Sequence, residues 1–398
     1  MKIGLVLPAT PRYSETFFVN KIKGLQDNGY SVALFVQTVR PNFNLCPVYK
    51  TPQVHKNKLV LVFNLLWTVV TLFPHIKKVL KFYRLSKLSK QQSSDILKQI
   101  FLNSHILKKH LDWLHFGFAT QAIGSELIAK AINAKMAVSL RGFDINIYPK
   151  KHKNCYTLLW ENIDKVHSIS KYLYSEALRL GLPKNIPYSI IAPAVDINKI
   201  KAITESSHIK QNKNLKLCSV ARLNWIKGLT TGIKTIAILK EVYADIEFHI
   251  IGDGNTKERE RYLFLVMQLG LEDNVFFHYK LEHKQTLELI ASSDLYIQTS
   301  INEGFCNAVI EAQALGKLCV ATNVGGLKEN IIDGKTGWLV PKQNPQEVSR
   351  KIRYVLELDN KEKTEVSQNA LKRVKNEFNL ENQRKQFIDF YCDRVSSF

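Results

Sequence analysis

Two glutamates, Glu303 and Glu311, stand eight residues apart in the segment EGFCNAVIE. Gly304 follows the first glutamate, and the second lies in an apolar run whose composition predicts a helix. The N-terminus of a helix offers unpaired N–H groups and a partial positive charge, which suit a phosphate. Carboxylates accept hydrogen bonds from hydroxyl groups. The segment therefore predicts a site for a ligand with both hydroxyls and phosphates, such as a nucleotide-sugar.

Two cations upstream have a complementary chemistry. In SVARLNWIKG, residues 219–228, Arg222 ends a predicted strand and Lys227 precedes a predicted helix. Two cations at such a place can neutralise a diphosphate. Breaking a sugar–phosphate bond builds negative charge on the departing oxygens, and fixed cations stabilise that charge best in the transition state. Two surface cations beside a turn are the alternative interpretation of the pair.

The strands and helices that must position these residues alternate as in βαβ units. A short apolar strand at 2–8, a helix at 15–28 and a strand at 30–36 predict a parallel sheet covered by helices. The same pattern restarts near residue 215, with a helix expected at 228–242. Two doubly wound α/β domains are therefore predicted, with ligands in the cleft beyond the carboxyl ends of the strands. The further expected strands are 113–115, 136–140, 165–169, 188–191, 215–220, 246–251, 274–278, 295–298, 318–321 and 337–340.

A chain of 398 residues exceeds a typical single core, which again indicates two domains. A polar, uneven segment at 193–210 marks the expected boundary. The predicted division is a first domain at 1–195, a second at 196–375 and a terminal helix at 376–398.

The whole run from Glu303 to Pro341 is more specific than the glutamate spacing alone. It continues with Gly325–Gly326 and TGWLVP at 336–341, and in this form it resembles the retaining glycosyltransferases of family 4, which have the GT-B fold. Within this family it resembles the bacterial transferases of exopolysaccharide, lipopolysaccharide and colanic-acid type. The resemblance implies two facing Rossmann-like domains and a C-terminal helix that crosses back to the first of them.

The resemblance also implies roles for the residues already named. Arg222 and Lys227 would hold the donor phosphates and stabilise the leaving nucleoside diphosphate, while Glu303 would contact hydroxyls of the donor sugar. Glu311 would form a hydrogen bond with the ribose, although the helix dipole also explains a glutamate in the first turn of a helix. The other donor-side candidates are Gly304, Phe305, Cys306, Asn307, Gly252 and Leu281.

Two donor-side segments keep alternatives open. Gly252 lies in IIGDGN, residues 250–255. In relatives the matching loop borders the donor pocket, but a GDG sequence also suits a tight turn. Residues 275–285, which include Leu281, stand where relatives seat the base. Relatives often have glycine where Tyr279 stands, so the identity of the base stays open.

Three segments of the first half resemble the acceptor side of the same transferases. PRYSETFFVNKIKGL, residues 11–25, resembles their SETFI opening, and Ser14, Glu15 and Thr16 would begin a helix beside the cleft, a position that helix capping explains equally well. LHFGFAT, residues 114–120, resembles their HFG segment and contains His115, which a buried core position would also explain.

SLRGFDIN, residues 139–146, resembles the HGxD segment of the family. Arg141 stands where many relatives have histidine, so the role of that histidine does not carry over. An arginine there could meet a phosphate or an acidic sugar. Asp144 matches the family position and either orients the loop or contacts the acceptor.

Composition separates the two halves. The net charge is +21, and residues 1–195 contribute most of it, with 27 Lys or Arg against 9 Asp or Glu. A basic half attracts nucleic acid, anionic lipid or acidic glycan. The six cysteines show no CxxC spacing, which favours a reducing compartment over a disulfide framework or a zinc site. We expect neither a metal site nor a cofactor, because no DxD motif stands out and family 4 enzymes typically work without a metal.

One apolar segment, LVLVFNLLWTVVTLF at 59–73, does not fit a plain sheet. As a helix ended by Pro74 it would span about 22 Å, which is short of the roughly 30 Å hydrocarbon core, so a transmembrane helix is not expected. A lysine-rich stretch follows it. Together, residues 59–90 predict either a membrane-docking element or a long core helix with a solvated basic neighbour.

We therefore expect a retaining, metal-independent glycosyltransferase that moves a sugar from a UDP- or GDP-sugar to a lipid-linked glycan. We expect it in the cytoplasm, peripheral to the inner face of the plasma membrane, in the biosynthesis of a cell-surface polysaccharide. A sugar-nucleotide epimerase of the same fold is the first alternative. A glycosidase that uses the two glutamates and a basic nucleic-acid-binding protein are weaker ones, the last because no recognition motif accompanies the charge.

Overall fold

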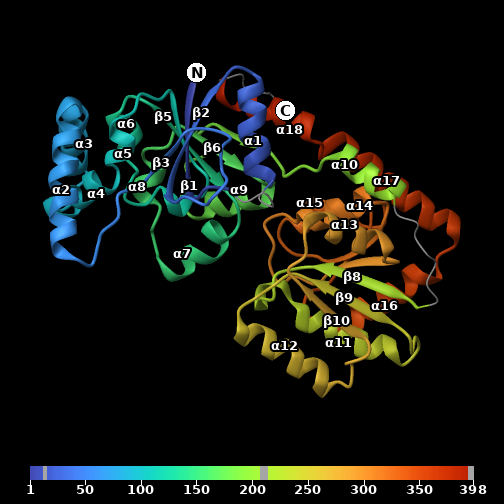
Figure 1. Ribbon diagram of the computed structural model, residues 1–398. Helices are drawn as coiled ribbons and strands as arrows, with labels where there is room; N and C mark the ends of the chain where they lie inside the picture. The colour runs from blue at the N-terminus through green and yellow to red at the C-terminus, as the bar shows by residue number, and fades with distance from the viewer. Residues whose placement is uncertain (12–15, 207–213, 393–398) are drawn as a thin grey trace. The chain divides into compact units, whose positions relative to one another are not determined.

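The computed structural model describes residues 1–11, 16–206 and 214–392. The chain divides into two compact units. One consists of Met1–Ile191 with the segment that begins at Arg384, and the other of Ala192–Gln383. Each unit is built on one sheet whose neighbouring strands all pair in parallel, with helices on both sides of the sheet (Figure 1). Ser14 and Glu15 lie outside the described residues.

The sheet of the first unit has seven strands in the order β3-β2-β1-β4-β5-β6-β7. Strand β1 lies between β2 and β4, so that Ile3 is in register with Val32 on one side and with Trp113 on the other. The strand order reverses direction at this point. The strands are β1 (Lys2–Ala9), β2 (Ser31–Thr38), β3 (Val48–Lys50), β4 (Trp113–Phe116), β5 (Lys135–Leu140), β6 (Lys165–Ser168) and β7 (Tyr188–Ile190).

The sheet of the second unit has six strands in the order β10-β9-β8-β11-β12-β13. Its reversal of strand order falls between β8 and β11. The strands are β8 (Lys216–Val220), β9 (Glu247–Ile251), β10 (Val275–Tyr279), β11 (Leu295–Gln298), β12 (Leu318–Thr322) and β13 (Trp338–Val340). The predicted fold class, two doubly wound α/β halves, is therefore confirmed.

The helices of the first unit, as far as the structure describes it, cover both faces of its sheet. They are α1 (Thr16–Asp27), α2 (Lys58–Leu72), η1 (Phe73–His75), α3 (Ile76–Leu88), α4 (Ser93–Leu102), α5 (Ser104–Leu107), η2 (Ala119–Gln121), α6 (Ile128–Ala131), η3 (Phe143–Ile147), α7 (Tyr148–Lys151), α8 (Thr157–Trp160) and α9 (Lys171–Arg179).

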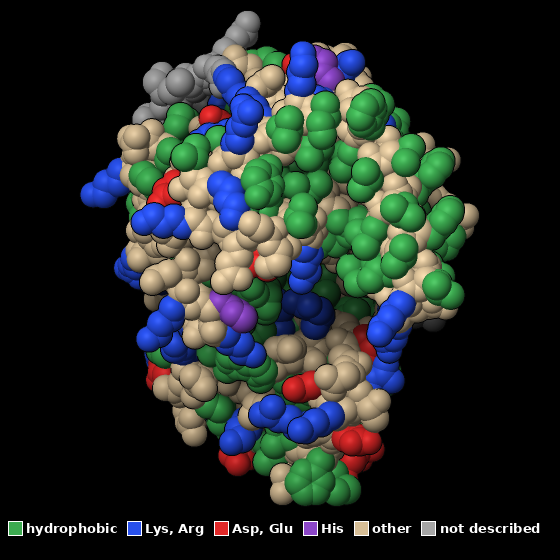
Figure 2. All heavy atoms as spheres, turned by 90° about the vertical axis from the view of Figure 1, so that its left-hand side faces the viewer, with side chains coloured by type: hydrophobic (Ala, Val, Ile, Leu, Met, Phe, Trp, Pro, Cys, Tyr) green, Lys and Arg blue, Asp and Glu red, His purple; other side chains and the backbone are tan. Residues whose placement is uncertain are grey.

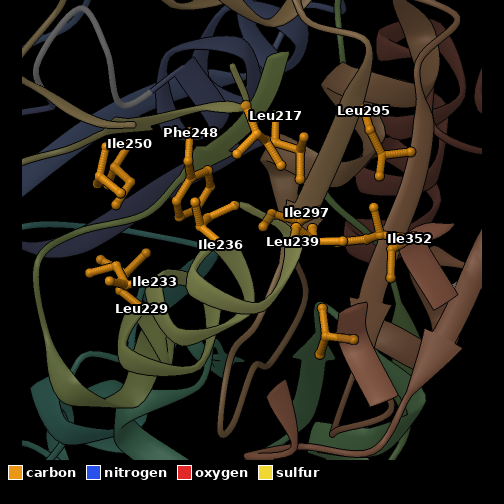
Figure 3. Packing of buried hydrophobic residues seen from close by; sticks show 14 of the residues in the cluster. Leu217, Leu229, Ile233, Ile236, Leu239, Phe248, Ile250, Leu295, Ile297 and Ile352 are labelled. Carbon is orange, nitrogen blue, oxygen red and sulfur yellow. The ribbon is translucent and has the colours of Figure 1, made fainter. Parts of the chain in front are cut away.

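Helices α11 (Leu229–Lys240) and α16 (Pro345–Glu357) of the second unit bury apolar side chains against its strands. Side chains of α11 and α16, such as Ile236 and Ile352, meet Leu217 of β8 and Ile297 of β11 in one cluster (Figure 3). The helices are α10 (Ile197–Ser206), η4 (Trp225–Lys227), α11 (Leu229–Lys240), α12 (Thr256–Gln268), α13 (His283–Ser292), α14 (Asn307–Ala314), α15 (Leu327–Asn330), α16 (Pro345–Glu357) and α17 (Asn360–Glu377), and α18 (Leu380–Tyr391) follows them.

The predicted terminal helix at 376–398 does not start as one helix, because its first residues belong to the end of α17 and a second helix, α18, follows after a break. Helix α17 ends at Glu377, and α18 begins at Leu380. The Asn379 side chain accepts a hydrogen bond from the Asn382 N–H at 2.8 Å, as a cap at a helix start does. Asparagine competes with helical backbone bonding in this way, which explains the break.

The later part of α18 completes the core of the first unit. Phe387, Phe390 and Tyr391 are each 1% exposed and pack with side chains of β1 and α1. The Lys165 ammonium donates to the Phe390 carbonyl at 2.7 Å, and the Tyr391 hydroxyl lies 2.7 Å from His115 Nδ1.

A chain of buried hydrogen bonds extends from this contact. His115 Nε2 lies 2.8 Å from Ser139 Oγ, which lies 2.7 Å from His167 Nδ1, and His167 Nε2 faces the Ile191 carbonyl at 3.0 Å. Burial, with the charge of Lys21 next, holds the pKa of both histidines well below the usual range. With both rings neutral, His167 donates to Ile191 and accepts from Ser139. The serine then accepts from His115, which accepts from Tyr391.

This network predicts loss of stability in acid. Unfolded histidine binds a proton below about pH 6.5, whereas His115 and His167 stay neutral in the folded state. The unfolded state then binds more protons, so the free energy of unfolding should fall by up to about 1.4 kcal/mol per pH unit for each histidine as pH drops below about 6.5. Urea unfolding between pH 7.5 and 5.5 measures this slope. His167→Gln should make the slope shallower, and an unchanged slope would contradict the assignment.

The apolar segment forms a longer helical path than predicted. Helix α2 continues through η1 into α3, and the path from Lys58 to Leu88 covers 31 residues. Helix α2 itself ends at Leu72, with Phe73 as its C-cap directly before Pro74, as predicted, but the helical path continues beyond the proline. Pro74 lies in the first turn of η1, where its missing N–H breaks no helical bond. By length and composition alone this path of 31 residues could cross a membrane, whereas the prediction considered only its first 15 residues. Only 11% of its most apolar window is buried.

Candidate functional site

The predicted donor residues gather in loops at one edge of the second sheet. Because its strands are parallel, their carboxyl ends lie at the same edge. The loops after β8 and β11 carry the residues with charge. These two strands are neighbours at the reversal of strand order, which is where open α/β sheets bind ligands.

Local bonds fix the loop that carries Lys227. The Asn224 side chain accepts from the Ile226 N–H at 3.1 Å and starts the single turn η4, in which Lys227 is the last residue. The Ile226 carbonyl accepts from the Ile301 N–H at 2.8 Å, so the loop after β8 is tied to the loop after β11. Gly228 follows with φ of +60°, a left-handed conformation that favours glycine, and α11 begins behind it.

The pairing of Lys227 with Glu303 is the central contact of the site. Lys227 Nζ lies 2.6 Å from Glu303 Oε2, and the two side chains are 15% and 13% exposed. The Ser300 hydroxyl donates to the same carboxylate oxygen at 3.2 Å. The structure thus brings together one predicted phosphate-binding cation and the predicted sugar-binding acid, from the loops after β8 and β11.

Arg222, the second predicted cation, lies two residues beyond the end of β8 and is exposed. Its backbone is held by the neighbouring loop. The Leu223 N–H donates to the Asp253 carbonyl at 3.0 Å, and a Cβ on Gly252 would meet the Ala221 carbonyl oxygen at 2.2 Å. Arg222 therefore projects from the same strand end as Lys227, with its charge open to solvent.

The loop with Glu303 is packed against the loop after β12. The Gly326 N–H donates to the Glu303 carbonyl at 2.8 Å, and a Cβ on Gly326 would stand 1.9 Å from the Gly304 carbonyl oxygen. The Asn330 side chain accepts a hydrogen bond from the Cys306 N–H and donates one to the Cys306 carbonyl, at 3.0 Å each. The glycines of the 303–341 run thus allow two backbones to approach and hold the Glu303 loop in place.

Helix α14 starts at Asn307, directly after this loop. Asn307 is exposed, whereas Gly304, Phe305 and Cys306 are buried. Burial raises the pKa of the Cys306 thiol to about 12, so the thiol stays protonated at neutral pH and is no nucleophile. Phe305 packs edge-on against Phe378 at 5.4 Å between ring centroids and anchors the loop.

Glu311 is the fifth residue of α14, so the explanation by a first-turn dipole contact does not apply. Its Oε1 lies 2.9 Å from Nε2 of His283, the first residue of α13. His283 Nδ1 in turn lies 3.3 Å from Lys199 Nζ. His283 was missed as a site residue, although it stands inside the 275–285 segment, because a single histidine carries no spacing signal.

The remaining donor-side predictions fall at neighbouring strand ends. Gly252 has φ of +134° directly after β9, and its missing Cβ leaves room for the loop after β8, which supports the tight-turn interpretation. Asp253 in the same turn binds Arg259 at 2.8 and 2.7 Å, and these bonds lower the pKa of its carboxyl. Leu281 lies half-buried between β10 and α13.

Tyr279 occupies a backbone position that suits glycine. Its φ is +46°, a conformation that costs a residue with a Cβ about 1 to 2 kcal/mol. We therefore expect Tyr279→Gly to be more stable than Tyr279→Ala by about 1 kcal/mol, the reverse of the usual order in a strand. Chemical unfolding of the two variants measures the difference. The alanine variant is the matched control for the lost ring, and greater stability of alanine would contradict the strain.

In the first unit, Asp144 organises two loops. Its buried carboxylate accepts from the backbone N–H groups of Ala119 at 3.1 Å, Arg141 at 3.1 Å and Gly142 at 2.8 Å. Burial raises the pKa of Asp144, and these bonds oppose the rise. The contacts favour the loop-orienting role over contact with an acceptor.

Arg141 follows β5 and stacks on aromatic rings of α1, with its guanidinium 3.8 Å from the Phe17 centroid and 4.4 Å from that of Phe18.

His115 is 0% exposed, and its place in the hydrogen-bond chain described above favours the core alternative. Thr16 is the first residue of α1. Among the residues that the structure describes, no three His, Cys, Asp or Glu side chains are grouped in a way that could hold a metal ion.

Comparison with solved structures agrees with this architecture. A crystal structure of Alr3699/HepE from Anabaena in complex with UDP superposes with a TM-score of 0.73 at 16% identity, over 98% of this chain and 99% of that chain. The fold is thus the GT-B architecture of glycosyltransferases.

The sequence comparison makes the assignment more specific. Residues 201–373 match the family model described as Glycosyl transferases group 1, so the chain carries a domain of this family and is a glycosyltransferase. It is 24% identical to the putative colanic acid biosynthesis glycosyltransferase WcaL of Escherichia coli K12, over 95% of this chain and 96% of that protein. The amylovoran biosynthesis glycosyltransferase AmsK of Erwinia amylovora is also 24% identical, over 87% and 88% respectively.

Proposed function

We propose that the chain is a retaining glycosyltransferase that transfers a sugar from a nucleotide-sugar, a UDP- or GDP-sugar, to a lipid-linked glycan in the synthesis of a surface polysaccharide. The observation that carries this proposal is the Lys227–Glu303 pair at the reversal of strand order in the second sheet. A cation for phosphate and an acid for hydroxyls stand side by side there. A structural neighbour that binds UDP-glucose, and relatives named for colanic acid and amylovoran biosynthesis, support the donor and the acceptor class.

In the proposed reaction the bond between the anomeric carbon and the diphosphate oxygen breaks, and the acceptor oxygen bonds the same face of that carbon. The acceptor proton passes to an oxygen of the departing diphosphate. Lys227 stabilises the charge that grows on this leaving group, and Arg222 at the same strand end adds a second positive charge. Glu303 accepts from sugar hydroxyls and fixes the orientation of the ring.

Binding of the diphosphate requires Lys227 to change partners. In the structure its charge is balanced by Glu303, and a diphosphate would draw the ammonium away while the sugar hydroxyls occupy the carboxylate. The proposal includes catalysis without a metal ion, since the two cations supply the positive charge. It also includes a cytoplasmic place at the inner face of the plasma membrane, which suits the six free cysteines.

A panel of nucleotide-sugars tests the function directly. The true donor should raise the melting temperature of the full chain most, because a ligand that binds the folded state stabilises it. With a lipid-linked acceptor, that donor should yield a product whose new linkage keeps the anomeric configuration, in the presence of EDTA as well as in its absence. Epimerised donor formed without any acceptor would instead favour the sugar-nucleotide epimerase. Loss of transfer in EDTA would contradict metal independence.

A further inference from the structure

Helix α2 carries large apolar side chains on its outer surface. Residues on successive turns are between 61% and 75% exposed, although each would normally be buried in a protein of this size. Exposed apolar patches of this extent mark surfaces that bind a partner or a membrane. The most exposed members at the centre and end of α2 are Phe63, Leu66, Trp67, Val69 and Val70, and the exposed Phe73 follows directly after the helix, in η1.

The inward face of α2 is the more polar one. Asn64, Thr68 and Thr71 are half-buried and share one stripe at helical spacing, together with the buried Leu72. Thr71 Oγ1 accepts from Lys108 Nζ at 2.6 Å, so this face is bonded to the protein. A helix on the surface of a water-soluble protein shows the opposite arrangement, with its apolar stripe inward. Helix α2 thus has its polar face toward the protein and its apolar face outward, an arrangement that suits apolar surroundings such as lipid.

Helix α3 shows the ordinary arrangement. Phe82 and Ser86 are buried, and Lys78 Nζ donates to the Lys109 carbonyl at 2.6 Å, which fastens α3 to the first unit. Ile76, Leu80 and Leu88 of α3 are also exposed, but the polar inward stripe belongs to the 15 residues of α2. These span about 22 Å, less than the roughly 30 Å of a hydrocarbon core, so α2 alone is too short to cross a bilayer while α3 stays packed.

Cations stand at both ends of the apolar surface. Lys56 and Lys58 precede it, while Lys77, Arg84 and Lys87 follow, and all five are exposed. No Asp or Glu occurs between residues 28 and 94. Figure 2 shows the face of the molecule that carries α2, where hydrophobic side chains gather in one broad patch and Lys and Arg side chains lie beyond it. The charge complements the phosphates of anionic lipids.

We propose that α2 is the membrane-binding element of the chain and lies in the headgroup region of an anionic bilayer, with its outer surface in the acyl boundary. The flanking cations meet lipid phosphates, while α3 stays packed on the protein. The inference goes beyond the transfer reaction and does not rest on it, because vesicle binding is measured without catalysis. A failed donor screen with intact vesicle binding, or the reverse, would separate the two proposals.

The first test removes the apolar surface. The full chain should float with vesicles of phosphatidylcholine and phosphatidylglycerol, and Leu66→Glu with Val70→Glu should reduce its partitioning at least tenfold. The matched control is Phe264→Glu with Met267→Glu, two residues one turn apart on α12 that are 55% and 57% exposed. This control should float like the unchanged chain. Equal flotation of the α2 variant would overturn the proposal.

The second test removes the charge. Lys77→Gln, Arg84→Gln and Lys87→Gln together should weaken binding to anionic vesicles about a hundredfold, since each cation near the surface contributes about fivefold. The control replaces three exposed cations of the second unit, Lys257, Arg353 and Lys361, by glutamine. Binding to phosphatidylcholine alone should be weak and insensitive to either set. An equal loss in the control would show that general charge, rather than this surface, attracts the vesicles.

Trp67 reports insertion without relying on a disruptive substitution. Its emission should shift to the blue when anionic vesicles are added, and Trp67→Phe should keep vesicle binding while losing most of that shift.

Two further outcomes would overturn the proposal. A chain that is dimeric without lipid, becomes monomeric in the Leu66→Glu, Val70→Glu variant and ignores vesicles would assign the surface to a second copy. Resistance to alkaline extraction would show a spanning helix.

Discussion

Replacing Lys227 with alanine should lower turnover at least a hundredfold. In the proposed transfer, the ammonium gains its strongest interaction when the diphosphate departs, so its loss should reduce kcat and kcat/KM together rather than raise KM alone. Steady-state rates of transfer with the identified donor measure this effect. The structural reason for choosing Lys227 is its place, 2.6 Å from Glu303 and between two strand-end loops.

The matched control for this substitution is Lys234→Ala. Lys234 is an exposed residue of α11, two turns beyond Lys227, and its loss should change the rate less than twofold. The Lys227→Ala variant leaves Glu303 without its cation, so its circular dichroism should first be shown to match that of the unchanged chain. A normal rate in a folded Lys227→Ala chain would refute the role in catalysis.

Replacing Gly228 with alanine should disrupt both stability and activity. Gly228 has φ of +60°, and a Cβ there would lie 2.0 Å from the Thr299 carbonyl oxygen, which real structures do not tolerate. The loops after β8 and β11 must then separate, and they are the loops that carry Lys227 and Glu303. We expect a loss of more than about 3 kcal/mol in the free energy of unfolding, as for other severe packing conflicts.

Gly270 provides an unusually close control. It also has φ of +60°, but a Cβ there meets nothing within 4 Å. Gly270→Ala should therefore cost only the strain of a left-handed residue, about 1 to 2 kcal/mol, and leave activity in place. The difference between the two variants in urea unfolding isolates the contact with Thr299. Equal losses would mean that backbone conformation alone requires Gly228.

The strands were predictable because a parallel sheet buries them on both faces, so each reads as a short apolar run such as KLCSV in β8. Strand β3 was missed because its three residues, VYK, lie at the edge of the sheet and carry no such run. The break between α17 and α18 depends on the cap at Asn379, a single side-chain bond that apolar periodicity does not report.

The site was predictable to the extent that charge and glycine spacing encode it. Lys227 and Glu303 were both named, and the structure brings them into contact although they are 76 residues apart. The contact of Glu311 with His283 could not be foreseen, because it depends on the relative placement of α13 and α14. The burial of His115 likewise depends on α18, which comes from the far end of the chain.

The return of α18 to the first unit has a consequence for the order of events during synthesis. The second unit is continuous in sequence, from Ala192 to Gln383, and can assemble as soon as it leaves the ribosome. The first unit begins earlier but lacks Phe387, Phe390 and Tyr391 until the segment that follows the second unit has also been made. The half made first is therefore the last to close, and a prematurely terminated polypeptide would present an unfinished core to chaperones and proteases.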